Sequence, residues 1–474
     1  MIQSLAEVSA VTRALSAYIA EAGMRPLPAE VAEKAKHHLL DTIAAMISGS
    51  RLLPGQMAHR WAALQGGPRD ASIMASRQRT SVITAALVNG MLAHADETDD
   101  SHAPSRNHPG CAVIPAALAT AEAHHAGGEA LLRAIVLGYD VAARVNYALD
   151  ADAYAMAFRS THSTGGTFGA GAAAGSLLGF DAQQARYLLS FCAQQASGVG
   201  CNVRDTDHIE KAFDFGGMPA RNGATAATMI AAGFTGVDDV FSGERNFFDA
   251  FAPNPRPEEL VAGLGERFEI LGTNIKKWSV GSPAQSALDA LVAILKQAPL
   301  TPSDIESIVV HLPTRSARTV DDAPMPDINV QHLLSVMLID GALSFHMAHD
   351  YARMRDPAIV ALKRRIRLQG SEELMHARPR RQAIVDVTTI DGRRFSHRTI
   401  AVRGTADNPM ERGEVEAKAR DLIADVLGRR RANEIIRAIG KIETVADVAR
   451  LQRLWRPPAA AKADAAGSPA TPIA

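Results

Sequence analysis

Residues 163–197 read STGGTFGAGAAAGSLLGFDAQQARYLLSFCAQQAS, and this stretch indicates the architecture of the first half of the chain. Its apolar residues recur at three- and four-residue spacing, which is the period of an α-helix, so we expect helices over 163–178 and 182–197. Alanine and glycine fill the faces of both helices. Because small side chains let helix axes approach closely, the stretch predicts a compact domain of tightly packed helices.

The helical period continues on both sides of this stretch, from the N-terminus to about residue 250. We expect one helix to open near Pro28 and to end near Gly49, because proline is favoured in the first turn of a helix and glycine at its end. Further helices are expected over residues 81–95, 112–124, 129–149 and 220–232.

After about residue 265 the pattern changes to a mixture of strands and helices. Residues 305–312 predict a strand, and residues 382–390 and 393–402 predict a hairpin around the turn Asp391-Gly392. Helices are expected at about 283–296 and 330–346, and the helical period returns over 411–454. These patterns predict a mostly α protein with an α+β part: a helical domain of residues 1–265 completed by 405–455, an inserted α+β domain of 266–404, and a disordered tail of 456–474.

Composition excludes several classes of partner. The chain has 474 residues with 50 Lys+Arg and 51 Asp+Glu, a formal net charge of −1, so no global field attracts nucleic acid or an anionic membrane, and we expect neither as a partner. Cys111, Cys192 and Cys201 are widely spaced, which argues against a disulfide framework and a zinc site and favours a reducing, cytoplasmic location. We expect no signal peptide and no transmembrane helix.

The densest polar stretch is HADETDDSHAPSRNHPG, residues 94–110. A metal site would use His94, His102, His108 and Asp99 or Asp100, but their spacing matches no zinc motif. An acid–base site is the stronger hypothesis, because histidine titrates near neutrality and a neighbouring carboxylate orients its ring. The alternative is a solvated acidic loop that caps helices.

Other residues that could carry chemistry lie further along the chain. His162 precedes a glycine-rich helix start, although a lone histidine is more often structural than catalytic. Lys211 and Lys276 lie near aromatic residues in the sequence, and Arg221 follows Lys211 closely. A lysine beside aromatic residues is less often a free surface charge. His346 and His349 would share one helix face, where such a pair is more often used in packing than in metal binding.

Several ordered motifs together resemble the MmgE/PrpD family, whose members include 2-methylcitrate dehydratase, cis-aconitate decarboxylase and iminodisuccinate epimerase. The motifs are AALVNGMLAHADETDDSHAPSRNHPG (85–110), LLRAIVLGYDVAARV (131–145), the stretch 161–198, and EKAFDFGGMPARNGATAATMIAAGFTG (210–236). The resemblance runs from about residue 30 to about 405. It implies a large all-α domain interrupted by a smaller α+β lid domain, a homodimer, and a site in the cleft between the domains that needs no metal or other cofactor.

The resemblance also implies positions for the site residues. The family's acidic loop falls on Glu97, Thr98, Asp99, Asp100 and Ser101, followed by His108, its second histidine falls on His162, and its lysines fall on Lys211 and Lys276. This chain departs from the common pattern with Glu97 in place of aspartate, Ser279 and Gln285 in place of a proline and a histidine, and His332 in place of a tyrosine. Its GGMP stretch is one residue longer.

On this basis we expect a lyase or isomerase that moves a proton at a carbon next to a carboxylate of a small di- or tricarboxylate. His108 and His162 are the expected acid–base groups and Glu97 and Asp100 tune them. The expected substrate contacts come from Lys211, Lys276, Arg221, Ser101 and His332. A dehydratase of the 2-methylcitrate type is the first expectation, an epimerase of a dicarboxylate such as iminodisuccinate or a cis-aconitate-type decarboxylase is the alternative, and a non-catalytic helical binding protein is the competing class.

Overall fold

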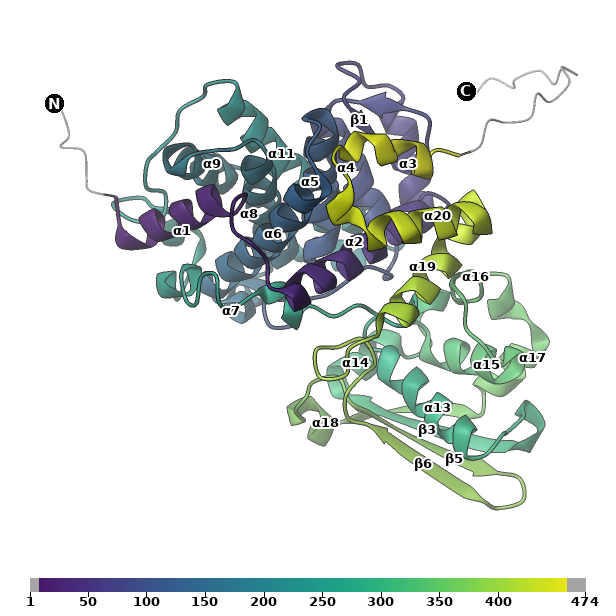
Figure 1. The fold of residues 1–474 in the computed structure, drawn as a ribbon. Helices are drawn as coiled ribbons and strands as arrows, with labels where there is room; N and C mark the ends of the chain where they lie inside the picture. Colours follow the sequence, from purple (N-terminus) through teal and green to yellow (C-terminus); the bar gives the residue numbers. More distant parts are fainter. Residues whose placement is uncertain (1–7, 458–474) are drawn as a thin grey trace, which may run out of the picture.

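The fold consists of a large helical domain and a smaller α+β lid domain that lies against it (Figure 1). The structure is a computed structural model that describes residues 8–457. The expected fold class, mostly α with an inserted α+β part, is confirmed. The predicted disordered tail lies, from residue 458 onward, outside the described residues.

The first part of the chain is helical, with one short two-stranded sheet. Pro28 precedes the second helix, as expected, and Gly49 is that helix's last residue. The elements are α1 Ala10–Glu21, α2 Ala29–Gly49, α3 Leu53–Ala62, β1 Ala71–Ser72, β2 Arg79–Thr80, α4 Val82–Ala93, α5 Pro109–Ala123, α6 Gly128–Ala148, α7 Ala151–Met156, α8 Thr161–Leu177, α9 Ala182–Gln194, α10 Ile209–Ala212, α11 Met218–Ala231 and α12 Phe247–Phe251.

Helix α8, which carries the Gly/Ala-rich stretch, lies in close contact with both α6 and α11. A β carbon added at Gly169 would approach the carbonyl oxygen of Gly138 on α6 to 2.5 Å, and one added at Gly223 on α11 would approach the Ala170 β carbon to 2.6 Å. These positions leave no room for a larger side chain. The small residues therefore set the spacing of the helices that support the start of α8.

Between α10 and α11 the chain forms a π-helical turn, η2 Phe213–Gly217. A π turn closes its hydrogen bonds one residue later than an α turn, so it accommodates an additional residue in a continuous helical segment. The turn includes the two glycines of the GGMP stretch. Its Gly216 packs directly against the backbone of Gly90 on α4.

The lid domain contains a four-stranded mixed sheet in the order β4-β3-β5-β6, with β3 and β4 parallel and the other neighbours antiparallel. The expected hairpin turns at Gly392, which has φ +84°. The helix expected over 330–346 is divided, because Gly341 at φ +68° ends its first part. The elements are α13 Gln285–Gln297, β3 Ile305–Pro313, α14 Thr314–Val320, α15 Val330–Asp340, α16 Phe345–Ala348, α17 Pro357–Lys363, β4 Ile366–Ser371, α18 Glu372–His376, β5 Ala383–Thr389 and β6 Arg394–Thr399.

After the lid the chain returns to the helical domain through α19 Arg412–Leu427, α20 Arg429–Gly440 and α21 Gln452–Trp455. Helix α19 packs on α2, and both contribute to one apolar core. The Trp455 Nε1–H donates to Ser72 Oγ at 2.9 Å. Short 3₁₀ helices connect the larger elements: η1 Gly200–Arg204, η3 Pro257–Leu260, η4 Glu269–Gly272, η5 Pro302–Asp304, η6 Pro326–Ile328, η7 Arg353–Arg355, η8 Ile442–Thr444 and η9 Val448–Leu451.

The two chain connections between the domains lie beside each other. The Ile275 N–H donates to the Gly404 carbonyl at 2.9 Å, and Asn274 exchanges backbone hydrogen bonds with Ser101 at 2.9 and 3.0 Å. The incoming connection is thus held against the acidic loop of the helical domain. Among residues 8–457, no helix is both long enough and apolar enough to span a bilayer.

Candidate active site

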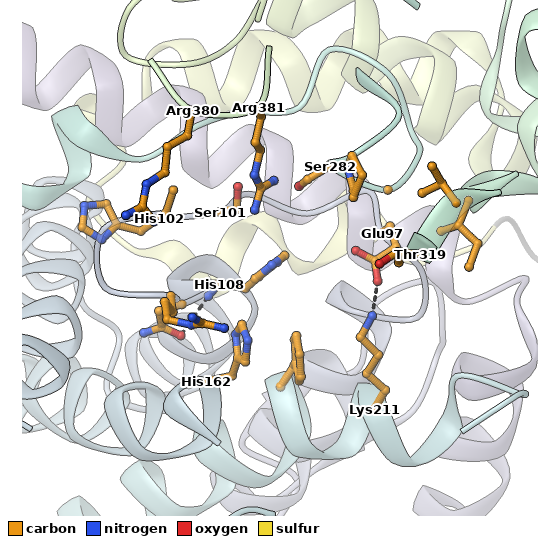
Figure 2. A pocket seen from close by; sticks show the side chains of 18 residues that line it. Glu97, Ser101, His102, His108, His162, Lys211, Ser282, Thr319, Arg380 and Arg381 are labelled. Atoms are coloured by element: carbon orange, nitrogen blue, oxygen red, sulfur yellow. Dashed lines mark hydrogen bonds and ion pairs between the residues drawn. The ribbon is translucent and has the colours of Figure 1, made fainter. Parts of the chain in front are cut away.

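A cavity of about 440 Å³ lies between the helical domain and the lid (Figure 2). Five of the residues expected from the sequence line it: Glu97, Ser101, His108, His162 and Lys211. The remaining wall is formed by His102, Ala103, Arg106, Asn107, Phe215, Gly281, Ser282, Pro283, Thr319, Val320, Ile328, Arg380 and Arg381. Both domains therefore contribute side chains to one cavity.

His108 is positioned by a buried carboxylate behind it. The acidic loop runs from the end of α4 at Ala93 to the start of α5 at Pro109. Within it, Asp99 accepts hydrogen bonds from Nδ1 of His94 at 3.0 Å and from Nδ1 of His108 at 3.1 Å. Because Nδ1 of His108 carries the donated proton, Nε2 holds the lone pair in the neutral ring.

Burial lowers the pKa of His108 and outweighs the opposing charge of Asp99. The positive charge of Lys276 acts in the same direction as burial. The ring is therefore neutral near pH 7 and can accept a proton at Nε2.

His162 is the second residue of α8, and its ring stacks on Phe215 with centroids 3.6 Å apart and planes 14° apart. The Ser160 hydroxyl fixes the helix start by accepting from the Ser163 N–H at 3.2 Å. The rings of His162 and His108 lie 5.1 Å apart between centroids. Burial, followed by the charges of His108 and His94, holds the pKa of His162 well below its usual value. The cavity therefore presents two neutral imidazoles side by side.

Glu97 is held between two lysines. Lys211 Nζ forms an ion pair with the Glu97 carboxylate, and Lys276 Nζ donates to the Glu97 carbonyl at 2.6 Å and lies 3.6 Å from Asp99 Oδ1. Burial opposes ionisation of Glu97, yet the charges of Lys211 and Lys276 hold its pKa well below its usual value. Burial likewise opposes the charged form of Lys211, but the carboxylate raises the pKa of that lysine. Lys276 does not line the main cavity and acts on it through these contacts.

Asp100 lies behind the cavity wall. It accepts hydrogen bonds from the Tyr139 hydroxyl at 2.5 Å, from His38 Nδ1 at 2.8 Å and from the Gly110 N–H at 3.0 Å. It is fully buried and does not line the cavity. Asp100 thus anchors the acidic loop to α2, α6 and the first turn of α5, which places His108 indirectly.

Arg221 and His332 lie outside the cavity, although we expected both to contact substrate. Arg221 on α11 lies 5.6 Å from the Phe213 ring centroid and donates to Asn222 Oδ1 at 2.8 Å. His332 is fully buried, in the first turn of α15 in the lid, and burial followed by the charges of Lys363 and Arg353 lowers its pKa to about 4.

Sequence reasoning missed several residues of the wall. Phe215 was noted only as an aromatic neighbour of Lys211, and Arg380 and Arg381 come from a lid loop more than 160 residues away. The basic run HARPRR, residues 376–381, was the available signal. The other wall residues that the sequence did not single out include Arg106, Ser282 and Thr319, and His102 was considered only as a metal ligand.

Two groups near the cavity bring three potential metal ligands within 4.8 Å of one another: His94, Asp99 and Cys111, and His94, Glu97 and His208. In the first group Asp99 already accepts from two histidines and lies near Lys276. In the second group Glu97 is paired with Lys211. A cation would have to compete with these lysines, so the donor sets suit ion pairing with the protein's own cations better than a resident metal.

Comparison with known proteins agrees with the motifs. The MmgE/PrpD N-terminal domain matches residues 13–260 and the MmgE/PrpD C-terminal domain matches residues 278–444. Similar proteins include a cis-aconitate decarboxylase-like protein of Aspergillus oryzae, 25% identical over 94% of this chain and 97% of that protein. Cis-aconitate decarboxylases of Homo sapiens and Aspergillus terreus are 24% and 23% identical, over 90% and 95% of this chain and 91% and 96% of their own lengths. With matches over both domains, the chain belongs to the MmgE/PrpD family.

Proposed function

We propose that this protein is a lyase that acts on a small polycarboxylate by proton transfer at a carbon next to a carboxylate, without a cofactor. The observation that carries the proposal is the pair of neutral imidazoles, His108 and His162, in one cavity with Lys211. A C–H bond next to a carboxylate is weakly acidic, so its cleavage needs a positioned base and cations that stabilise the charge that develops. The cavity supplies both.

In this proposal Nε2 of His108 exchanges a proton with the substrate. Asp99 behind the ring stabilises the imidazolium that forms when the proton is taken up. His162 acts as the second proton-transfer group from the neighbouring position. Lys211 and the Ser101 hydroxyl, which line the same wall, stabilise the negative charge on the substrate carboxylate.

Decarboxylation is the reaction that the relatives favour, since proteins named as cis-aconitate decarboxylases match 90% or more of this chain. Loss of carbon dioxide leaves an electron pair on the carbon skeleton. A neutral histidine of the cavity takes a proton from water and passes it to this carbon, which returns the ring to its neutral form. This places decarboxylation ahead of the dehydration that we expected first. Dehydration is the second candidate, because the Asp99–His108 pair would also stabilise an imidazolium that protonates a departing hydroxide.

The reaction type is tested by incubating the protein in deuterated water with cis-aconitate, 2-methylcitrate and iminodisuccinate in turn. Release of carbon dioxide together with one deuterium in the product supports decarboxylation. New absorbance of a conjugated alkene without carbon dioxide supports dehydration, and deuterium in an otherwise unchanged skeleton of inverted configuration supports epimerisation. No turnover of any polycarboxylate, by a protein that binds them, would instead support the non-catalytic binding class.

We also propose that the protein works without a cofactor, forms a homodimer and has a cytoplasmic location. Activity that persists after dialysis against a metal chelator supports a site that works without metal, and light scattering of the purified protein measures its oligomeric state. Activity restored only by an added metal would contradict the first of these expectations.

A further inference from the structure

Two of the basic side chains in the cavity wall have no carboxylate in direct contact. Lys211 is paired with Glu97, and Arg106 lies 2.9 Å from Asp152. Among residues 8–457, neither Arg380 nor Arg381 forms a hydrogen bond or an ion pair through its side chain. Glu97 acts on Arg381 and Asp152 acts on Arg380 only from beyond ion-pair distance, so the protein compensates these two charges incompletely.

Both arginines belong to the lid loop between α18 and β5. Figure 2 shows them reaching from the lid towards Ser101 and His102, while His108 and His162 lie on the other side of the cavity. The positive charge and the proton-transfer groups thus occupy opposite walls. A ligand that spans the cavity would contact both.

Arg381 is the more enclosed of the two arginines, because Arg380 is exposed. The Arg381 backbone adopts a left-handed conformation with φ +67°, which is uncommon for a residue with a β carbon. Its side chain is partly buried, so the guanidinium loses part of its hydration without gaining a partner from the protein. A guanidinium presents parallel N–H donors that match the two oxygens of a carboxylate.

We propose that Arg380 and Arg381 bind a second, non-reacting carboxylate of the substrate and thereby restrict the site to compounds with at least two carboxylates. This inference rests on the proposed function, because it places the reacting carbon of the same molecule beside His108 and His162. Lys211, which we place at the reacting carboxylate, is paired with Glu97, and Lys276 lies close to Asp99, so neither lysine is free to hold a second carboxylate as well. The lid arginines complete the site by neutralising the distal end of the ligand.

The test is calorimetric titration with three unreactive probes: tricarballylate, butyrate and inorganic phosphate. Wild-type protein is compared with Arg380→Gln, Arg381→Gln and the double variant. Arg378→Gln is the matched control, because Arg378 lies in the same loop, is exposed, and donates to backbone carbonyls at 3.1 and 3.5 Å instead of lining the cavity. A thermal melt of each variant verifies folding.

We expect each single substitution to weaken tricarballylate binding about 10- to 100-fold, as for loss of a hydrogen-bonded charged partner, and Arg378→Gln to leave it unchanged. Arg381→Lys restores only part of the affinity, because an ammonium group lacks the paired donors. Butyrate, with one carboxylate, binds equally to all the proteins.

Unchanged tricarballylate affinity in the double variant overturns the inference, and so does phosphate binding that depends on the arginines while tricarballylate binding does not. Failure of the proposed function has a different signature, namely arginine-dependent binding of tricarballylate with no turnover of any polycarboxylate. For any polycarboxylate that is turned over, Arg381→Gln lowers kcat/KM by a similar factor and Arg378→Gln does not.

Discussion

His162 is enclosed by an aromatic ring on one face and a second imidazole beside it, and these contacts decide its protonation state. Phe215 excludes water from the ring, and burial with the neighbouring His108 disfavours a positive charge there. A proton that arrives at His162 is therefore held weakly and is readily passed on. This is the property required of a group that transfers a proton during turnover.

Replacement of His162 by alanine is expected to lower kcat about 10²- to 10⁴-fold on any accepted polycarboxylate, the range for loss of a general acid or base. Circular dichroism and thermal melting should show a folded protein. His346→Ala is the control, since His346 is exposed on the lid. Retention of full activity by a folded His162→Ala protein would remove His162 from the mechanism.

The pH dependence of kcat/KM follows from the lowered pKa values of the two imidazoles. Both rings stay neutral until the pH falls below 6.5, so the acid limb of kcat/KM is expected below pH 6.5. The substrate's own ionisation is titrated separately and subtracted. An acid limb at or above pH 6.5 would contradict the assignment of these buried rings as the proton acceptors.

The sequence predicted the site residues that lie close to a recognisable motif. His108, His162, Glu97 and Lys211 were placed by their motifs and do line the cavity. The position of His332 could not be predicted in the same way. It stands where the family pattern has a tyrosine, and the sequence does not show whether the histidine at that position reaches the cavity. The lid arginines reach the cavity only through the packing of the two domains, and no pattern in one sequence encodes that packing.

At the scale of elements, the π turn η2 connects Lys211 to the ring of Phe215. Lys211 precedes the turn in α10 and Phe215 lies within it, so the geometry of the turn sets the position of Phe215 relative to Lys211. The turn is held by the close approach of Gly216 to Gly90. Its geometry therefore depends on the absence of a β carbon at this contact.

Gly216→Ala is expected to lower the free energy of unfolding by about 1–3 kcal/mol, because an added β carbon would overlap the Gly90 carbonyl oxygen. Activity should also fall, since Phe215 is displaced. Gly440→Ala is the matched control, with nothing within 4 Å of the added β carbon, and should change stability by less than about 0.5 kcal/mol. Chemical denaturation measures the free energy of unfolding of both variants. Equal stabilities of Gly216→Ala and Gly440→Ala would refute the steric argument.

Helix and strand prediction succeeded where one face of an element is buried. Strand β5 alternates buried and partly exposed residues, and the hairpin at Gly392 was expected from this pattern. Strand β4, Ile366–Ser371, was missed, because it is an edge strand in which only Ile366 is buried and no alternation is visible. The break at Gly341 was missed because the apolar period continues on both sides of it.

At the scale of the whole molecule, an ion pair joins the lid to the helical domain beside the candidate site. Nε2 of His349 in the lid lies 2.8 Å from Asp96 Oδ2 in the acidic loop. Burial opposes protonation of His349, but Asp96 outweighs it and raises the pKa of the histidine to about 9. The pair therefore holds the two domains together while the ring is charged.

Because the folded-state pKa of His349 is raised above about 6.5, its contribution to stability is fully present below pH 6.5 and is lost as the pH rises through about 9. We expect the melting temperature of His349→Gln to lie furthest below that of wild type at about pH 6 and to converge with it above pH 9. His346→Gln, at an exposed position, should show no such trend. A difference in melting temperature between His349→Gln and wild type that stays constant from pH 6 to 10 would show that the charge of His349 does not contribute to stability.

The return of α19 to the face of α2 imposes an order on biosynthesis. Leu39 and Ile43 on α2 share a core with Leu422 and Ile423 on α19, yet more than 360 residues of chain separate the two helices. As the chain leaves the ribosome, α2 emerges with this face uncovered, and the whole lid must be synthesised before its partner appears. The helical domain is therefore the first to begin folding and the last to finish, and a nascent chain halted within the lid exposes an apolar surface that chaperones would recognise.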